Sequence, residues 1–146
     1  MAERKRRLAR LIETSDNVEF GQYGQGASDD LVRNTENQLG IKLPPSYVWW
    51  LQNYGGGTVF GDEIFSIYEQ ESDEVVGCDI VRMHRINSEK NWFSKDQLVI
   101  CETDEAVYYF DVSQPDQNGE FPVYEHYSGQ KIADDFIEFL IRLIER

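Results

Sequence analysis

The stretch LGIKLPPSYVWWLQNYGGG, residues 39–57, carries the strongest structural signals in this chain. Gly40 stands where a helix would end in a left-handed residue, and two prolines follow shortly after it. Pro45 suits the first turn of a helix, where its missing N–H costs nothing. The stretch therefore predicts a helix that ends at residue 39 and another that begins at residue 45.

The helix predicted over 45–54 has one apolar face. Its large apolar residues recur at i, i+3, i+4 and i+7, namely Tyr47, Trp50, Leu51 and Tyr54. Three glycines at 55–57 then end the helix and open a strand-rich region. They lack the Lys-Ser/Thr ending of a phosphate-binding loop and do not fit GxGxxG, so we expect a structural role for them.

Outward from this stretch, the sequence predicts helices first, strands in the middle and a helix last. The expected helices cover residues 3–13, 29–39 (with Ser28 as N-cap), 45–54, 75–86 and 134–146. The expected strands cover residues 58–60, 64–68, 98–102, 106–111 and 120–124, the last three in an antiparallel sheet, and residues 17–26 form a loop. This order predicts one α+β domain over residues 1–146 and not a series of βαβ units.

The last expected helix is apolar over most of its surface. One stripe runs along it, and three isoleucines widen that stripe: Phe136, Phe139, Leu140 and Leu143, with Ile137, Ile141 and Ile144. So wide a face should pack across a sheet, or against both a sheet and another helix. It also permits either a monomer or a homodimer.

Length and cysteine content bound the class of protein. The chain has 146 residues, enough for one domain with a buried core. Its two cysteines form neither a disulfide framework nor a metal-spaced cluster, which is typical of a reducing compartment. No apolar segment follows the basic residues 1–10, and no stretch approaches the roughly 18 apolar residues of a membrane span. We therefore expect a cytoplasmic protein that does not contact a membrane.

Charge is distributed unevenly in this chain, whose formal net charge is −13. Residues 1–10 hold five of the 14 Lys and Arg residues, and the rest of the sequence holds 26 of the 27 Asp and Glu residues. No Lys or Arg lies between Lys42 and Arg82, or between Lys95 and Lys131. Such a body repels phosphate backbones and attracts basic proteins. An acidic surface can equally serve solubility alone.

The order of these features resembles the SUKH superfamily. The residues that carry the resemblance are Val32, Glu36, Leu39-Gly40, Leu43-Pro44, Tyr47, Trp50-Leu51 and Tyr54-Gly55-Gly56-Gly57. Weaker matches are the strand end Tyr109-Phe110-Asp111 and the closing helix Asp135-Phe136-Ile137-Glu138-Phe139-Leu140. The resemblance covers residues 28–146 and leaves out the N-terminal helix and loop at 1–27.

The resemblance implies an α+β fold in which helices pack on one side of a mixed, mainly antiparallel sheet. It also implies a protein-binding role without catalysis. Bacterial single-domain members of the superfamily are mostly immunity proteins that neutralise polymorphic toxins, many of which are nucleases. Fungal members include regulators of cell-wall synthesis, so an intracellular scaffold or regulator is the alternative function.

An immunity protein would cover the active surface of a cognate toxin domain, and an acidic face suits a basic toxin. The acidic residues that follow Lys42, with two neighbouring aromatic residues, are the first candidates for this contact: Asp62, Glu63, Glu69, Glu71, Asp73, Glu74, Trp49 and Tyr68. The second cation-free window adds Glu102, Asp104 and Glu105. Trp49 is off the apolar stripe of its helix, so we expect it to be exposed near these carboxylates.

The sequence contains no recognisable catalytic constellation. His84 and His126 are the only histidines, and no HExxH, GxSxG or Cys/His arrangement accompanies them. Glu102, Asp104 and Glu105 surround an expected turn, where carboxylates can hold Ca²⁺ or act as acid and base. Their spacing does not fit an EF-hand loop, so we expect an acidic rim with no metal, no cofactor and no catalytic residue.

The basic first helix raises a competing hypothesis. Its cationic residues can touch the phosphates of a nucleic acid: Arg4, Lys5, Arg6, Arg7 and Arg10. Only a narrow apolar stripe accompanies them, and the rest of the chain is acidic. We therefore expect a solvated helix face and no direct binding of nucleic acid.

Overall fold

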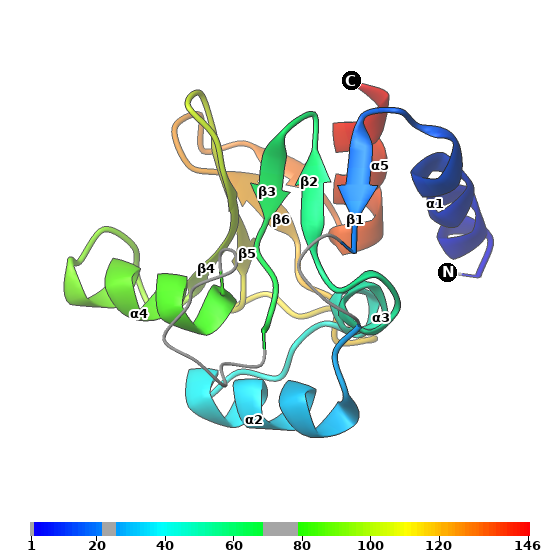
Figure 1. The fold of residues 1–146 in the computed structure, drawn as a ribbon. Coiled ribbons are helices and arrows are strands. Elements are labelled where there is room, and N and C mark those ends of the chain that lie inside the picture. The colour runs from blue at the N-terminus through cyan, green and yellow to red at the C-terminus, as the bar shows by residue number, and fades with distance from the viewer. Residues whose placement is uncertain (1, 22–25, 69–78) are drawn as a thin grey trace.

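The computed structural model describes residues 2–21, 26–68 and 79–146 (Figure 1). These residues contain five helices and seven short strands. The helices are α1 (Ala2–Thr14), α2 (Asp29–Leu39), α3 (Pro45–Tyr54), α4 (Ile80–Glu89) and α5 (Phe136–Glu145). The strands are β1 (Val18–Phe20), β2 (Gly57–Val59), β3 (Asp62–Ile64), β4 (Gln97–Glu102), β5 (Val107–Asp111), β6 (Val123–Glu125) and β7 (Lys131–Ala133). The predicted α+β class is confirmed.

All seven strands form one sheet, in which each strand pairs with its neighbours along the chain in the order β1-β2-β3-β4-β5-β6-β7. Every pairing is antiparallel, so successive connections lie at alternate ends of the sheet. The β2–β3, β4–β5 and β6–β7 turns therefore share one end, which is at the top in Figure 1. This shared end becomes important for the candidate site.

Local signals in the sequence explain where α2 and α3 begin and end. The Ser28 hydroxyl accepts a hydrogen bond from the backbone N–H of Leu31 at 3.2 Å, which caps α2. Gly40 ends α2 in the left-handed conformation, with φ 68°. Pro45 is the first residue of α3, where no intrahelical N–H bond is needed. Both predicted helices are confirmed with their expected bounds.

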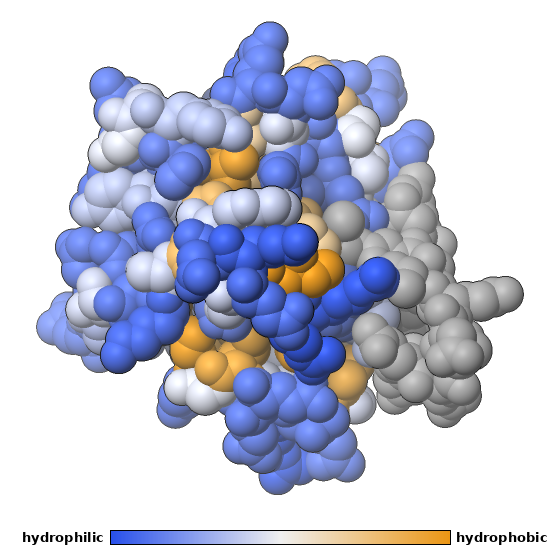
Figure 2. Space-filling model, turned by 90° about the vertical axis from the view of Figure 1, so that its left-hand side faces the viewer, coloured by the Kyte–Doolittle hydropathy of each residue, from blue (hydrophilic) through white to orange (hydrophobic). Residues whose placement is uncertain are grey.

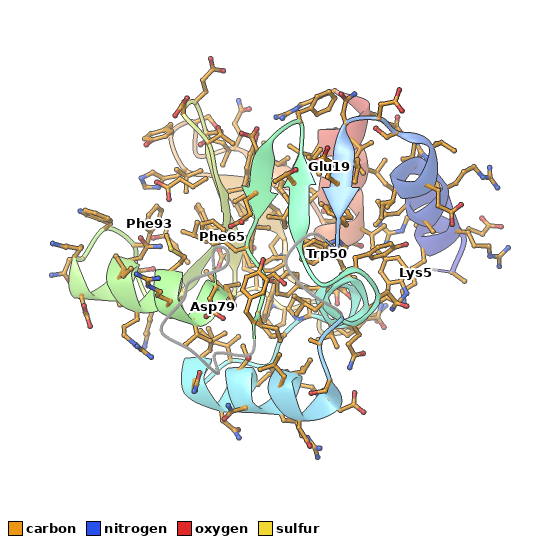
Figure 3. The ribbon with its side chains drawn as sticks, viewed as in Figure 1. Lys5, Glu19, Trp50, Phe65, Asp79 and Phe93 are labelled. Carbon is orange, nitrogen blue, oxygen red and sulfur yellow. The ribbon has the colours of Figure 1, made fainter. Side chains whose placement is uncertain are left out.

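Aromatic rings from α3, α5 and β5 form the centre of the core. The fully buried ring of Phe136 lies with its centroid 4.9 Å from that of Tyr47 and 5.4 Å from that of Trp50 (Figure 3 labels Trp50). Phe110 of β5 contacts Tyr47 and Phe136, at 5.6 Å and 6.0 Å. The two helices therefore pack on the sheet face that carries Phe110, and each buries its predicted apolar face there. On the other face, Phe93 contacts Tyr109.

The apolar surface of α5 is used within the chain. Its seven apolar residues are all buried: Phe136, Ile137, Phe139, Leu140, Ile141, Leu143 and Ile144. They contact the sheet, α3 and α1. The width of this face therefore gives no reason to expect a homodimer.

Helix α1 packs against α5 through one buried leucine and two ion pairs. Leu8 is fully buried. The Arg4 guanidinium donates to both carboxylate oxygens of Asp135, at 2.5 Å and 3.1 Å, and Arg7 pairs with Glu145. Asp135 also caps α5, since its Oδ1 accepts a bond from the N–H of Glu138. The first helix is thus joined to the last by both packing and charge.

The sequence had suggested that the basic residues of α1 face solvent, but not all of them do. The Nζ of Lys5 lies 5.4 Å from the ring centroid of Trp49, on the side of α1 that faces α3 (Figure 3). Arg6 and Arg10 are exposed. The expected solvated cationic face therefore reduces to these two arginines and the outer parts of Arg4 and Arg7.

Strand β1 corrects the loop predicted over residues 17–26. Its pairing with β2 depends on Gly57, which has φ 143°, and a Cβ at this position would lie only 2.0 Å from the backbone oxygen of Glu19. Only glycine permits so close an approach of two backbones. A strand of three residues is too short to show the alternation by which strands are recognised.

Strand β6 begins three residues later than the predicted strand over 120–124. The buried carboxylate of Glu120 accepts bonds from the backbone N–H and the hydroxyl of Ser46, at 3.0 Å and 2.5 Å. Ser46 lies in the first turn of α3, where N–H groups have no intrahelical partner. This bond draws Glu120 out of the sheet, and Pro122 has no N–H to pair. Strand β7, in contrast, was not predicted at all.

The elements predicted over 58–60, 64–68 and 75–86 are also displaced. Strand β2 starts one residue earlier, and β3 lies at 62–64. Helix α4 starts at Ile80 because the carboxylate of Asp79 accepts bonds from the N–H groups of Val81 and Arg82. Residues 75–78 of the predicted helix lie outside the described residues.

The phenol of Tyr47 supplies a test of this core. Its hydroxyl donates a bond of 2.6 Å to the backbone oxygen of Phe65, which joins α3 to the chain after β3 (Figure 3 labels Phe65). We expect Tyr47→Phe to lower the free energy of unfolding by about 1–2 kcal/mol, because a buried carbonyl loses its donor. Urea-induced unfolding measures the change. Tyr127→Phe, at a 71% exposed side chain, is the control and should change stability by less than about 0.5 kcal/mol. Equal losses in both variants would contradict this role for Tyr47.

Candidate partner-binding surface

Most of the acidic residues predicted to bind a partner meet at one end of the sheet. Ile64 of β3 is paired with Cys101 of β4, which brings the preceding residue, Glu63, beside Glu102. The described members of this group, which we call the acidic end, are Asp62, Glu63, Glu102, Asp104 and Glu105. Two sets of carboxylates that are about 40 residues apart in the sequence thus form one surface. The other acidic candidates, Glu69, Glu71, Asp73 and Glu74, lie outside the described residues.

The β4–β5 turn holds three of these carboxylates at the surface. Thr103 Oγ1 accepts bonds from the backbone N–H groups of Glu105 and Ala106, at 3.2 Å and 3.0 Å, and its own N–H bonds to the Ala106 oxygen. The turn is therefore closed by its threonine, and the side chains of Glu102, Asp104 and Glu105 are all exposed. Carboxylates that share one turn repel one another, and a cationic surface would relieve that repulsion.

A cation, Arg146, lies among these acidic residues. The guanidinium of Arg146 donates a bond of 3.1 Å to Asp62 and lies 5.2 Å from the ring centroid of Phe60. Asp62 is therefore partly neutralised within the chain. The negative charge of the acidic end comes mainly from the exposed carboxylates of the β4–β5 turn.

Two exposed aromatic residues flank the carboxylates, and the sequence did not single them out. Phe60 in the β2–β3 turn is 41% exposed, and Tyr127 in the β6–β7 turn is 71% exposed. Each stands in a hairpin turn close to a glycine, Gly61 or Gly129, and an aromatic residue in such a turn was the available signal. Phe60 has φ 51°, a left-handed conformation that is unfavourable for a bulky residue. Strained residues of this kind are concentrated at functional sites.

The turn that presents Tyr127 is held by Glu125. Its carboxylate accepts bonds from the backbone N–H groups of Tyr127 (2.9 Å), Ser128 (2.8 Å) and Val107 (3.1 Å). Desolvation favours the neutral form of Glu125, but these three donors outweigh it and lower the pKa of its carboxyl to about 2. The ionised carboxylate of Glu125 thus joins the β6–β7 turn to the start of β5 by hydrogen bonds.

The two aromatic residues predicted from the sequence lie elsewhere. Trp49 is half-buried on α3, where it contacts Tyr54 and Lys5. Tyr68 is half-buried too, and its N–H donates to Asp79 at the start of α4. Both positions are beyond the ends of β2 and β3 that are remote from the β2–β3 turn. The structure therefore does not place Trp49 or Tyr68 beside the carboxylates of the acidic end.

A cavity lies toward the opposite end of the sheet, and it too was not anticipated from the sequence. It has a volume of about 740 Å³ and lies between the end of α2, α4 and the β5–β6 loop. We call it the α2–α4 groove, and its apolar lining includes Leu39, Ile41, Leu43, Val112 and Phe121. Figure 2, which faces this side of the molecule, shows hydrophobic residues gathered between hydrophilic helix surfaces.

The two histidines lie in different parts of the described structure. Within the described residues, no three His, Cys, Asp or Glu side chains gather so that they could hold a metal ion. The ring of His126 packs on Phe93, with centroids 4.7 Å apart. His84 lines the α2–α4 groove, and burial lowers the pKa of its imidazole below the usual 6.5. No helix among the residues that the structure describes is long and apolar enough to cross a membrane.

An α+β domain with a meander sheet, a helix-covered face and an acidic end is thus defined. The SUKH_6 family, described as SMI1-KNR4 cell-wall, has a sequence profile that matches residues 29–140 of this chain. The chain therefore belongs to this family of the SUKH superfamily, as its sequence predicted. At the level of the family, membership supports a protein that acts through protein–protein contacts, as an immunity protein or as a scaffold of the SMI1-KNR4 kind. Helix α1 lies outside the matched residues.

Glu125 allows a test of how the β6–β7 turn, which presents Tyr127, is stabilised. We expect Glu125→Gln to lower the free energy of unfolding at neutral pH by about 1 kcal/mol, because three N–H groups lose an ionised acceptor near solvent. The folded pKa is below 4.5, so the stabilisation is present above that pH and is lost as the pH falls toward about 2. Urea unfolding across this range should show the two stability curves converging. The control, Glu105→Gln, removes an exposed carboxylate, and a gap of equal size there would contradict the assignment.

Proposed function

We propose that this chain is a cytoplasmic immunity protein that binds a cognate polymorphic toxin domain and covers its active surface without catalysis. The observation that carries the proposal is the acidic end, where turns of three hairpins bring carboxylates and exposed aromatic rings together. Family membership supports the class of function. The toxin would be basic, and we propose a nuclease domain as the best fit to this charge.

The charge of the acidic end suits the first step of such an encounter. The chain has a net charge of −13, and the carboxylates of the β4–β5 turn project from one end. A field of one sign steers an oppositely charged partner and raises its association rate. On a nuclease, carboxylates can occupy the positions that the phosphates of the substrate would take, because both are anionic oxygen acceptors.

Affinity requires buried apolar contact in addition to charge. Aromatic residues dominate the binding energy of many interfaces because they bury large surfaces with little loss of side-chain freedom. Phe60 and Tyr127 flank the carboxylates on two separate turns, at 41% and 71% exposure. We infer that these two rings are the anchors of the contact and that the carboxylates form its rim.

A scaffold or regulator of the SMI1-KNR4 kind is the second candidate, which the description of the matched family favours. It would also bind proteins, so surface chemistry alone does not separate the two functions. The decisive experiment is co-expression of this chain with the toxin domain encoded beside its gene in a sensitive bacterium. Rescue of growth with co-purification of a complex supports immunity. Continued killing with abundant folded chain and no complex would favour the scaffold.

Charge reversal tests the rim. Asp104→Lys with Glu105→Lys should slow association with the toxin domain by about tenfold at low ionic strength, and the difference should shrink as salt is added. Stopped-flow or surface-plasmon kinetics measure the rate. Glu3→Lys with Glu89→Lys makes the same change in net charge at exposed positions on α1 and α4. An equal effect in both pairs would reduce the acidic end to a general contribution of net charge.

Phe60 allows binding to be separated from folding. Phe60→Gly removes the ring and also relieves a left-handed backbone, so we expect the free energy of unfolding to be unchanged or higher by up to about 1 kcal/mol. Binding to the toxin domain should nevertheless weaken by about tenfold or more, since an aromatic anchor is lost. Calorimetry and urea unfolding give the two quantities. A variant that binds as tightly as the wild type would sink the anchor assignment.

A further inference from the structure

The α2–α4 groove combines an apolar lining with cations, in a chain that is otherwise strongly acidic. Leu43 and Phe121 are buried, and Leu39, Ile41 and Val112 are half-buried around them. Its volume of about 740 Å³ lies in the range of roughly 300–1,000 Å³ that is typical of ligand sites. An apolar hollow of this size on a surface indicates a binding site.

Hydrogen bonds within the chain hold the walls of the groove in place. The N–H of Leu43 donates to the carboxylate of Glu36 at 2.7 Å, which fixes the segment after α2. The N–H of Val112 donates to the backbone oxygen of Asp96 at 2.9 Å, which joins two other parts of the wall. In the β5–β6 loop, Asp116 accepts the N–H groups of Asn118 and Glu120. A preformed groove loses little conformational entropy when a ligand binds.

The polar residues of the groove specify the charge of its occupant. Lys42 and Lys95, both exposed, stand at its rim, with Asp96 as the one carboxylate in the lining among the described residues. These lysines are also the cations that begin the two long acidic windows of the sequence. The two lysines beside the lining are complementary to a carboxylate on a ligand, in contrast to the exposed carboxylates of the acidic end.

His84 adds a second polar feature. It lines the groove from α4, and its Nδ1 is buried with no hydrogen-bond partner among the described residues. Burial lowers the pKa of the imidazole, so the ring is neutral at physiological pH and can offer a nitrogen to a ligand. A buried nitrogen without a partner is costly, and rotation of the imidazole toward a bound backbone amide would satisfy it.

We propose that the α2–α4 groove binds a short partner segment that carries apolar side chains and at least one carboxylate. The apolar lining would receive the side chains, Lys42 and Lys95 would pair with the carboxylate, and His84 would bond to the backbone of the segment. This site is distinct from the acidic end in position and in the two lysines at its rim. It gives the chain a second contact, which does not depend on the proposed neutralisation of a toxin.

Selection from a phage-displayed library of random heptapeptides on the purified full chain tests the proposal. We expect enriched sequences to combine Leu, Ile, Val or Phe with Asp or Glu, and their synthetic forms to bind in fluorescence polarisation. Lys42→Glu with Lys95→Glu should weaken that binding by about tenfold or more. Ile41→Asp should weaken it by a similar factor through the apolar wall. Arg6→Glu with Arg10→Glu, on the exposed side of α1, makes the same change in net charge and should leave binding unchanged.

Several results would overturn the proposal. No enrichment, enrichment of peptides without acidic residues, or equal loss in the α1 control would each do so. Sedimentation measurements address a second copy of this chain as the occupant. A dimer that Lys42→Glu with Lys95→Glu dissociates would assign the groove to self-association instead. Because no toxin domain takes part in these measurements, their failure is independent of any failure of the proposed immunity function.

Discussion

The packing of Phe136 against Tyr47, Trp50 and Phe110 is the interaction on which the rest of the fold depends. These rings join α5, α3 and β5 in one buried cluster, although they lie as much as 89 residues apart in the sequence. With α3 fixed on the sheet, the chain leaves it through Gly57 directly into β2. With α5 fixed, Arg146, which directly follows this helix, reaches Asp62, the first residue of β3. The position of the acidic end therefore follows from a core contact that none of its own residues makes.

The meander topology then separates two surfaces of different chemistry. Alternate connections of an antiparallel sheet fall at opposite ends, so tight hairpin turns gather at one end and longer connections at the other. Tight turns expose their side chains, and here they expose carboxylates and two aromatic rings. The longer connections include the segment after α2 and the β5–β6 loop, which enclose an apolar groove with lysines at its rim. The two proposed contact surfaces therefore lie at opposite ends of the sheet.

How much of this could be read from the sequence depends on the length of each signal. Helices α2 and α3 have caps, prolines and a repeated apolar stripe, so many residues agree on one answer. Strands β1 and β7 have three residues each, which is less than the alternation pattern needs. Glu120 was placed in a strand because its buried bond to Ser46, 74 residues away, has no local signature. The order of the predicted elements already indicated the α+β class, and the family resemblance implied the same class, although several strands in the middle of the chain were displaced.

The candidate surface shows the same division between local and distant information. Runs without Lys or Arg identified carboxylates that converge, because a pairing such as Ile64 with Cys101 happens to join the two acidic windows. Trp49 was predicted to be exposed because it is off the apolar stripe of its helix, but it packs on Tyr54 and Lys5. Trp49 and Tyr68 both lie away from the β2–β3 turn. Phe60 and Tyr127 reach the surface because hairpin turns leave a bulky side chain nowhere to pack, and Phe60 does so in a strained backbone. Apart from the contact of the Phe60 ring with Arg146, folding gains little from an exposed ring in a left-handed turn beside clustered carboxylates. A partner that buries the ring and neutralises the carboxylates would relieve both the exposure of the ring and the repulsion among the carboxylates. This end of the sheet is therefore where we propose that a basic partner binds.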